Sequence, residues 1–292
     1  MQEQNPPVYE LERIATEIEQ LDNPGLTKLY LASRREYRSL VSRAELVSRS
    51  SGGVPSTGSR MFWGSVLFTR IVVTSKSVDL LLPNPKPGAH WDFSATASLT
   101  RNLLEACLVY FWLCGIGIDE IERQGRFILY NLHDHGSRKR LLPEGEENPD
   151  VHADLVRKFD ANEFLTKFDA KRRTVALKGE RTPFIQDDVL SEIGFDREHF
   201  RLVYRFFSEH THTGPLAFYR VLEHDRGTGV ETRHEKQYMI IVLGIAAEFL
   251  THAIEVQLDI MTDVDKKRPY LTRGQIKANV ERAQGRTGAR RR

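Results

Sequence analysis

Apolar residues recur at intervals of three, four and seven along most of the chain, which is the period of an amphipathic helix. The segment 26–49 shows this best, with arginines between its apolar positions Leu26, Leu29, Tyr30, Tyr37, Leu40, Val41, Ala44 and Val47. The stretch SSGGVPSTGS at 50–59 predicts a loop. A second helix is predicted from Met61 to Leu82, ended by PNPKPGAHWD at 83–92.

The segment 93–115 is apolar on nearly every side, which is typical of a helix at the centre of a bundle. Further helices are predicted over 118–142, over 149–176 with Asn148-Pro149 at its start, and over 233–261. Between the last two, a helix is predicted from Asp196 to His212, and a separate short helix follows Thr213-Gly214-Pro215 and ends at Leu222. Residues 178–195 predict a loop with one short helix. No run of alternating strands is visible, so the sequence predicts an all-α chain.

Length and composition fit a globular protein with one large domain or two modest ones. The chain has 292 residues, of which 40% are hydrophobic and 28% charged. We expect an N-terminal helical extension at 1–55, a helical bundle at 56–265 and a basic, disordered tail at 266–292. The apolar run 239–247 is far shorter than the roughly 20 residues of a membrane span. With no signal-peptide pattern at the N-terminus, this predicts a cytoplasmic protein with no membrane partner.

Charge is distributed unevenly along the chain. Residues 273–292 hold seven Lys or Arg and one Glu, a charge of +6, which leaves −4 for the rest of a chain whose total is +2. A mildly acidic body lacks the electrostatic footprint of a nucleic-acid surface, so the tail is expected to supply any nonspecific affinity. The alternative is a solvated terminus with no role.

The two cysteines are seven residues apart on a predicted helix, which places their Cα atoms roughly 10 Å apart. Cys107 and Cys114 therefore cannot form a disulfide with each other. Two thiols in an apolar segment are typical of small core residues in a reducing compartment.

The sequence has no dinucleotide fingerprint, phosphate-binding loop, zinc-peptidase motif, Cys-x-x-Cys or nucleophile elbow. Two His-x-His pairs occur, His133 with His135 and His210 with His212, but neither has an evident third ligand nearby. We therefore predict no metal and no cofactor.

Two polar groups stand out on otherwise apolar helices. Arg101 and Glu105 are spaced i, i+4 on the most apolar helix, where a charge must be paired, and we expect them to form a buried pair in a polar pocket. The alternative is that the pair orients a histidine or phosphate from a facing helix. The second group lies on one face of the helix 196–212 and comprises Arg201, Arg205, Ser208 and His212, with Glu209 and His210 beside it.

The segment Arg205-Phe-Phe-Ser-Glu-His210 resembles the Arg-x4-His motif of the HEPN superfamily, helical-bundle proteins many of which are metal-independent ribonucleases or toxins. The blocks DFSATASLTRNLLEACLVYFWL, IERQGRFILYNLHDHGSRKRLL and YRFFSEHTHTGPLAF resemble a bacterial HEPN-like family of unknown function over roughly residues 60–260. The chain departs from the nuclease pattern at Phe206, where those members carry a polar residue. The resemblance implies a HEPN-like bundle.

If the resemblance extends to activity, the catalytic residues are Arg205, His210 and His212. His210 or His212 would take the proton of an RNA 2′-hydroxyl while Arg205 stabilises charge on the phosphate, and a homodimer would complete the cleft. Arg101, Glu105 and Ser208 would form the adjoining polar pocket. The other hypothesis is a non-catalytic interaction or sensor module, and the sequence leaves open whether the protein is an enzyme.

Overall fold

The computed structural model describes residues 18–51, 58–86, 88–141, 149–212, 214–215, 217 and 229–265, and these residues contain helices and no strand. The all-α prediction is confirmed. The basic tail and most of the predicted short helix before Leu222 lie outside the described residues.

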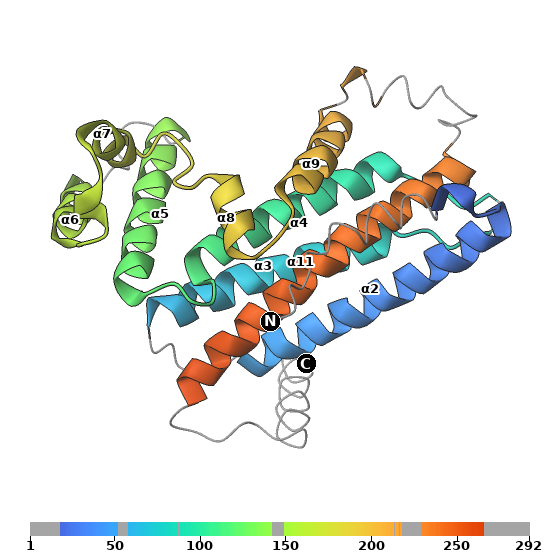
Figure 1. Cartoon of the computed structure of the whole chain (residues 1–292), viewed down its shortest axis with the longest axis horizontal. Coiled ribbons are helices and arrows are strands. Elements are labelled where there is room, and N and C mark those ends of the chain that lie inside the picture. The colour runs from blue at the N-terminus through green and yellow to red at the C-terminus, as the bar shows by residue number, and fades with distance from the viewer. Residues whose placement is uncertain are drawn as a thin grey trace, which may run out of the picture.

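Four long helices form the central bundle: α2 (Asn23–Ser51), α3 (Ser59–Leu81), α4 (Phe93–Cys114) and α11 (Arg233–Asp265). Helix α2 packs against α11 and α3, and α4 packs against α3 and α11 (Figure 1). More than half of the residues of α4 are buried, which confirms its predicted central place. Helix α2 falls within the predicted extension, yet it forms one side of this bundle.

The remaining described helices lie on the side of the bundle that α4 forms. Helix α5 (Glu120–Leu141) packs with α6 (Pro149–Ala161) and α7 (Ala170–Lys178) in a lateral lobe, at the left of Figure 1. Helices α8 (Gln186–Glu192) and α9 (Arg197–Thr211) pack on α4 itself. The Asp196 carboxylate caps α9 by accepting a hydrogen bond from the backbone N–H of His199 at 2.6 Å, as the sequence predicts.

The single helix predicted over 149–176 is wrong, because Asn162 ends α6. Its side-chain oxygen accepts hydrogen bonds from the backbone N–H groups of Phe164 and Leu165, and its amide donates to the carbonyl of Ile121 at 2.9 Å. These bonds compete with helix continuation. A 3-10 turn, η1 (Leu165–Lys167), follows before Asp169 caps α7.

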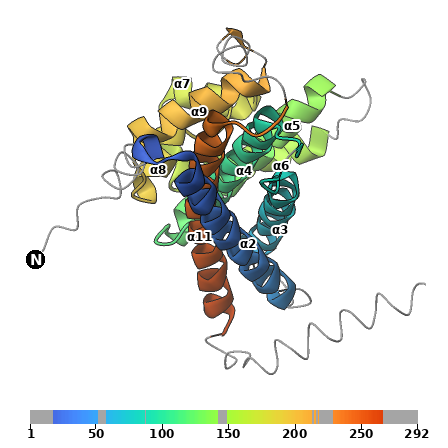
Figure 2. The ribbon, with the colours of Figure 1, turned by 90° about the vertical axis from the view of Figure 1, so that its right-hand side faces the viewer.

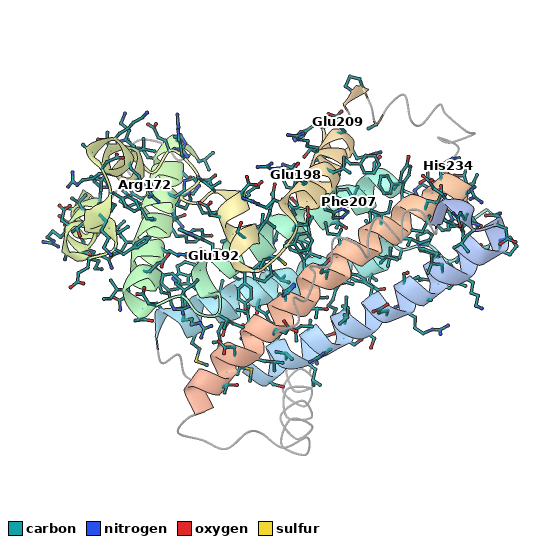
Figure 3. All side chains as sticks on the ribbon, in the orientation of Figure 1. Arg172, Glu192, Glu198, Phe207, Glu209 and His234 are labelled. Carbon is teal, nitrogen blue, oxygen red and sulfur yellow. The ribbon has the colours of Figure 1, made fainter. Side chains whose placement is uncertain are left out.

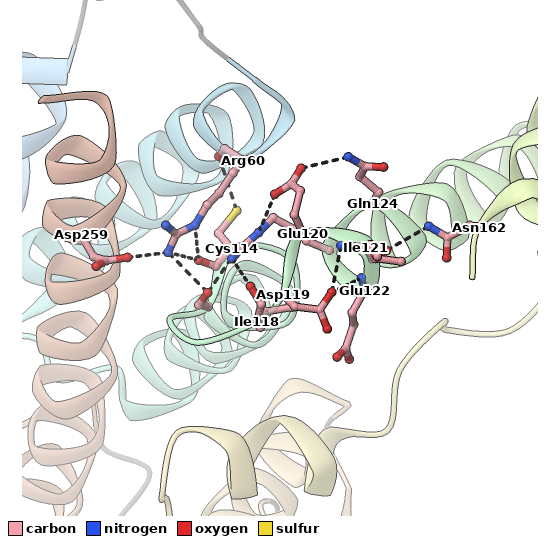
Figure 4. Close-up of polar contacts among 12 residues, drawn as sticks. Arg60, Cys114, Ile118, Asp119, Glu120, Ile121, Glu122, Gln124, Asn162 and Asp259 are labelled. Carbon is pink, nitrogen blue, oxygen red and sulfur yellow. Dashed lines mark hydrogen bonds and ion pairs between the residues drawn. The ribbon is translucent and has the colours of Figure 1, made fainter. Parts of the chain in front are cut away.

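Arginines hold the turn between α4 and α5 (Figure 4). The Arg60 guanidinium donates to the carbonyl of Cys114 at 3.0 and 3.1 Å and pairs with Asp259 of α11 at 2.6 Å. Arg123 donates to the carbonyls of Gly115 and Ile118 at 3.2 and 2.6 Å. These donors satisfy the carbonyls of Cys114 and Gly115 at the end of α4 and that of Ile118 in the following turn.

Both cysteines are buried free thiols, which confirms them as small core residues. Burial raises the pKa of the Cys114 thiol to about 12 and that of Cys107 further still.

Helix α11 is a longer apolar segment than the sequence run 239–247 indicates. The helix over 233–262 is long and apolar enough to cross a membrane by length and composition alone. Most of its apolar window is buried inside the structure, and the core helix of a bundle passes the same test.

Candidate functional site

The candidate site lies where α9 crosses α4. The residues Phe200, Val203 and Phe207 bury one side of α9, as their helical spacing predicts. Figure 3 shows Phe207 on the side of α9 that faces the bundle, with Glu198 and Glu209 on its outer side. Arg205 lies on this outer side, about 20° around the helix from Glu198, and His212 and Ser208 lie successively nearer the bundle.

The predicted ion pair forms, with Arg101 Nη2 3.0 Å from Glu105 Oε1. A residue from α9, Tyr204, completes it. The Tyr204 hydroxyl donates to Glu105 Oε1 at 2.5 Å and accepts from Arg101 Nη2 at 3.0 Å, and the Arg101 guanidinium lies 4.9 Å from the centre of the tyrosine ring. Tyr204 was not among the residues predicted for the site, although its position, one turn before Ser208, places it on the flank of α9.

The expectation that this pair is buried is wrong, most clearly for the carboxylate. The side chain of Arg101 is 18% exposed, but that of Glu105 is 41% exposed. Burial and the hydrogen bond to Glu105 both raise the pKa of Tyr204, so its hydroxyl keeps its proton and remains a donor.

His212 joins this network at the end of α9. It is exposed, and its Nε2 atom lies 3.5 Å from Arg101 Nη1, at the outer limit of a hydrogen bond. We call Arg101, Glu105, Tyr204 and His212 the polar cluster. It joins a cation, an anion, a phenol and an imidazole from two helices at the protein surface.

His210 has a different environment. It is 5% exposed, its Nδ1 atom lies 3.1 Å from the hydroxyl oxygen of Ser94, and its ring contacts Phe93 and Phe206 edge-on at 4.6 and 4.9 Å. Arg205, five residues before His210, lies about 140° around the helix from it and is exposed. Within one chain the structure does not bring Arg205 and His210 together.

Comparison with protein families gives one match, to DUF5677, a family of unknown function, over residues 61–229. The match covers more than half of the chain. The protein belongs to the DUF5677 family. Comparisons with curated proteins and with solved structures gave no significant match.

The DUF5677 match runs from α3 through α9 and so contains the whole polar cluster, whereas α2 and α11 lie outside it. None of these comparisons bears on the HEPN resemblance, which stays a prediction.

The polar group predicted on α9 of this DUF5677 chain offers less unpaired positive charge than the sequence indicates. The Arg201 guanidinium pairs with Asp187 and with Glu198, the latter at 2.6 Å. The Ser208 hydroxyl donates to the Tyr204 carbonyl at 2.8 Å, within its own helix. Arg205 is exposed and has no ion-pair partner among the described residues.

The other histidines in the described part of the chain do not form a metal site. His133 contacts the carbonyl of Gly179 at 2.9 Å, and His135 stacks on His152 with ring centres 5.0 Å apart. The sequence also contains two Glu-x-x-His pairs, ending at His212 and His234. Within the described parts of the chain, no three His, Cys, Asp or Glu side chains lie together as metal ligands.

Proposed function

We propose that this DUF5677 chain is a non-catalytic interaction or sensor module whose α4–α9 face binds an anionic group of its partner. The burial of His210, the histidine of the Arg-x4-His motif, carries the non-catalytic part of this proposal. A general base must reach the proton that it removes, and this histidine is enclosed by Ser94, Phe93 and Phe206.

The chemistry of the face supports an anionic ligand. Arg101 and Arg205 are permanent cations, and His212 adds a third positive charge when it is protonated. Glu105, the acid of the polar cluster, already accepts from Arg101 and Tyr204. Arg205 and His212 therefore remain available to the oxygens of a phosphate or a carboxylate.

The test is a titration of the full chain with inorganic phosphate, followed through the ring nitrogen signals of its histidines, with acetate as the carboxylate arm. We expect a saturable shift of the His212 signal with either or both anions, and a weaker response in Arg205→Gln. His133, whose ring already contacts the Gly179 carbonyl, is the internal control. No cleavage of single-stranded RNA is expected with the same protein.

The contact between Arg101 and His212 supports a second candidate, a metal-independent ribonuclease. Here His212, and not His210, takes the 2′-hydroxyl proton, while Arg101 and Arg205 stabilise the phosphate. RNA cleavage in a chelator that is lost in His212→Ala and kept in His210→Gln supports this candidate against the binding module. A homodimer that completes the cleft belongs to the same hypothesis.

A further inference from the structure

Helix α2 has a basic outer surface. Its buried residues, among them Leu26, Tyr30, Tyr37, Val41 and Ala44, lie on one side, against α11 and α3. Figure 2 shows α2 between these two helices. Helical periodicity places a set of exposed basic residues on the opposite side, which we call the basic face: Lys28, Arg35, Arg38, Arg43 and Arg49.

Most of this charge is not neutralised. Arg38 pairs with Asp79 of α3, and Arg49 pairs with Glu45, but both side chains remain about half exposed. Lys28, Arg35 and Arg43 have no ion-pair or hydrogen-bond partner among the described residues. Glu36 is the exposed acid of α2, and the half-buried Glu45 pairs with Arg49, so the face carries a net positive charge.

The face has the dimensions of an extended binding surface. Lys28 and Arg49 are 21 residues apart in one helix, so they are separated by about 31 Å along its axis. Four of the five cations are arginines, whose planar guanidinium groups bind phosphate oxygens in a bidentate manner.

The buried residues of α2 indicate which kind of polyanion fits the basic face. Both aromatic residues of α2, Tyr30 and Tyr37, are buried, so the face offers no ring on which an unpaired base would stack. A membrane-surface helix inserts its apolar side between lipids, but the apolar side of α2 is buried against α11 and α3. A duplex, which exposes phosphates and keeps its bases stacked, fits this face best.

We propose that the basic face of α2 binds the phosphate backbone of a double-stranded nucleic acid, independently of sequence. This site is separate from the α4–α9 face, on a helix outside the DUF5677 match. The net charge of the chain led us to expect nonspecific nucleic-acid affinity from the tail alone, whereas the basic face is a second source of it.

The test measures binding of the full chain to RNA and DNA duplexes by fluorescence anisotropy over a range of salt concentrations. In Arg35→Gln/Arg43→Gln, the slope of log affinity against log salt should fall by about 1.8, since each phosphate contact contributes about 0.9. The matched control is Arg157→Gln/Lys158→Gln, which removes two exposed charges from α6 and should leave the slope unchanged. The tail is present in every variant, so it contributes equally to each slope.

Either duplex arm can support the proposal, and the arm that binds more tightly identifies the nucleic acid. An unchanged slope in the α2 variant, with far-UV circular dichroism confirming its fold, would overturn it. So would tighter binding to single strands, or binding to phosphatidylserine vesicles that depends on the same arginines while duplex binding does not. None of these results affects the α4–α9 proposal, because Arg101, Arg205 and His212 are unchanged.

Discussion

The ring of His210 and the hydroxyl group of Ser94 meet at 3.1 Å inside the contact between α9 and α4. His212, two residues later, lies at the surface and approaches Arg101. Two histidines that are nearly adjacent in sequence therefore belong to different environments, one structural and one available to a ligand.

This difference predicts that two alanine substitutions lower the free energy of unfolding by very different amounts. His210→Ala removes a buried ring from between Phe93 and Phe206, and we expect a loss of about 2–4 kcal/mol in the free energy of unfolding. His212→Ala removes an exposed side chain and should cost no more than about 0.5 kcal/mol. Urea denaturation of the two variants checks this. Equal losses would show that His210 is not part of the core.

A second prediction concerns Arg126, which connects three helices. Its guanidinium bonds Glu122 of α5 and Glu192 of α8, each with a shortest distance of 2.6 Å, and donates to the Trp112 carbonyl of α4 at 2.9 Å. Arg126→Ala should lower the free energy of unfolding by about 2–4 kcal/mol, less than for a fully buried pair because both carboxylates reach solvent.

The exposed Arg157 is the matched control for Arg126. Its replacement by alanine should change the urea midpoint little, because exposed ion pairs contribute about 0–1 kcal/mol. If Arg126→Ala behaves like Arg157→Ala, the three-helix connection is not structural.

A third prediction concerns the crossing of α5 and α7. Gly179 ends α7 with φ of 62°, and a Cβ atom there would lie 2.1 Å from the backbone carbonyl oxygen of Leu132. Gly179→Ala therefore combines left-handed strain with a steric clash, and it should cost well over 2 kcal/mol.

Gly194 is the control for this crossing, with φ of 71° and open space around its Cβ position. Gly194→Ala should cost only the conformational strain, about 1–2 kcal/mol. Thermal unfolding separates the two variants. Similar melting temperatures would mean that α5 and α7 do not cross so closely.

A fourth prediction concerns stability at high pH. Burial raises the pKa of both thiols, to about 12 for Cys114, whereas the pKa of an unfolded thiol is about 8.5. Above that pH the unfolded state binds fewer protons than the native state, so the free energy of unfolding falls as pH rises toward 12. The slope is about 1.4 kcal/mol per pH unit for each thiol.

Urea denaturation between about pH 8 and about pH 11 measures this dependence. The variant Cys107→Ala/Cys114→Ala should show a shallower decline, because only its buried tyrosines still contribute. An identical decline in both proteins would mean that the native thiols ionise as freely as unfolded ones.

Local pattern predicted most of the fold. The apolar stripes of α2, α4, α9 and α11 and the Asp196 cap depend on residues close in sequence. The break at Asn162 was missed, because its bond to the Ile121 carbonyl spans 41 residues.

The candidate site was predicted in part. The spacing of Arg101 and Glu105 identified their pair, but Tyr204 joins it across 99 residues from Glu105. The basic face of α2 was missed because net charge averages over the chain, whereas folding gathers these arginines on one side of a helix. Acidic residues elsewhere in the chain offset these arginines in its net charge of +2.

The phosphate titration of His212 in the full chain is the most direct test of the proposed binding face. We expect a saturable shift of the His212 ring signal, weakened in Arg205→Gln, while the His210 signal stays in place. A His212 signal that does not respond to phosphate or acetate, or that moves in parallel with those of all other histidines, would contradict it.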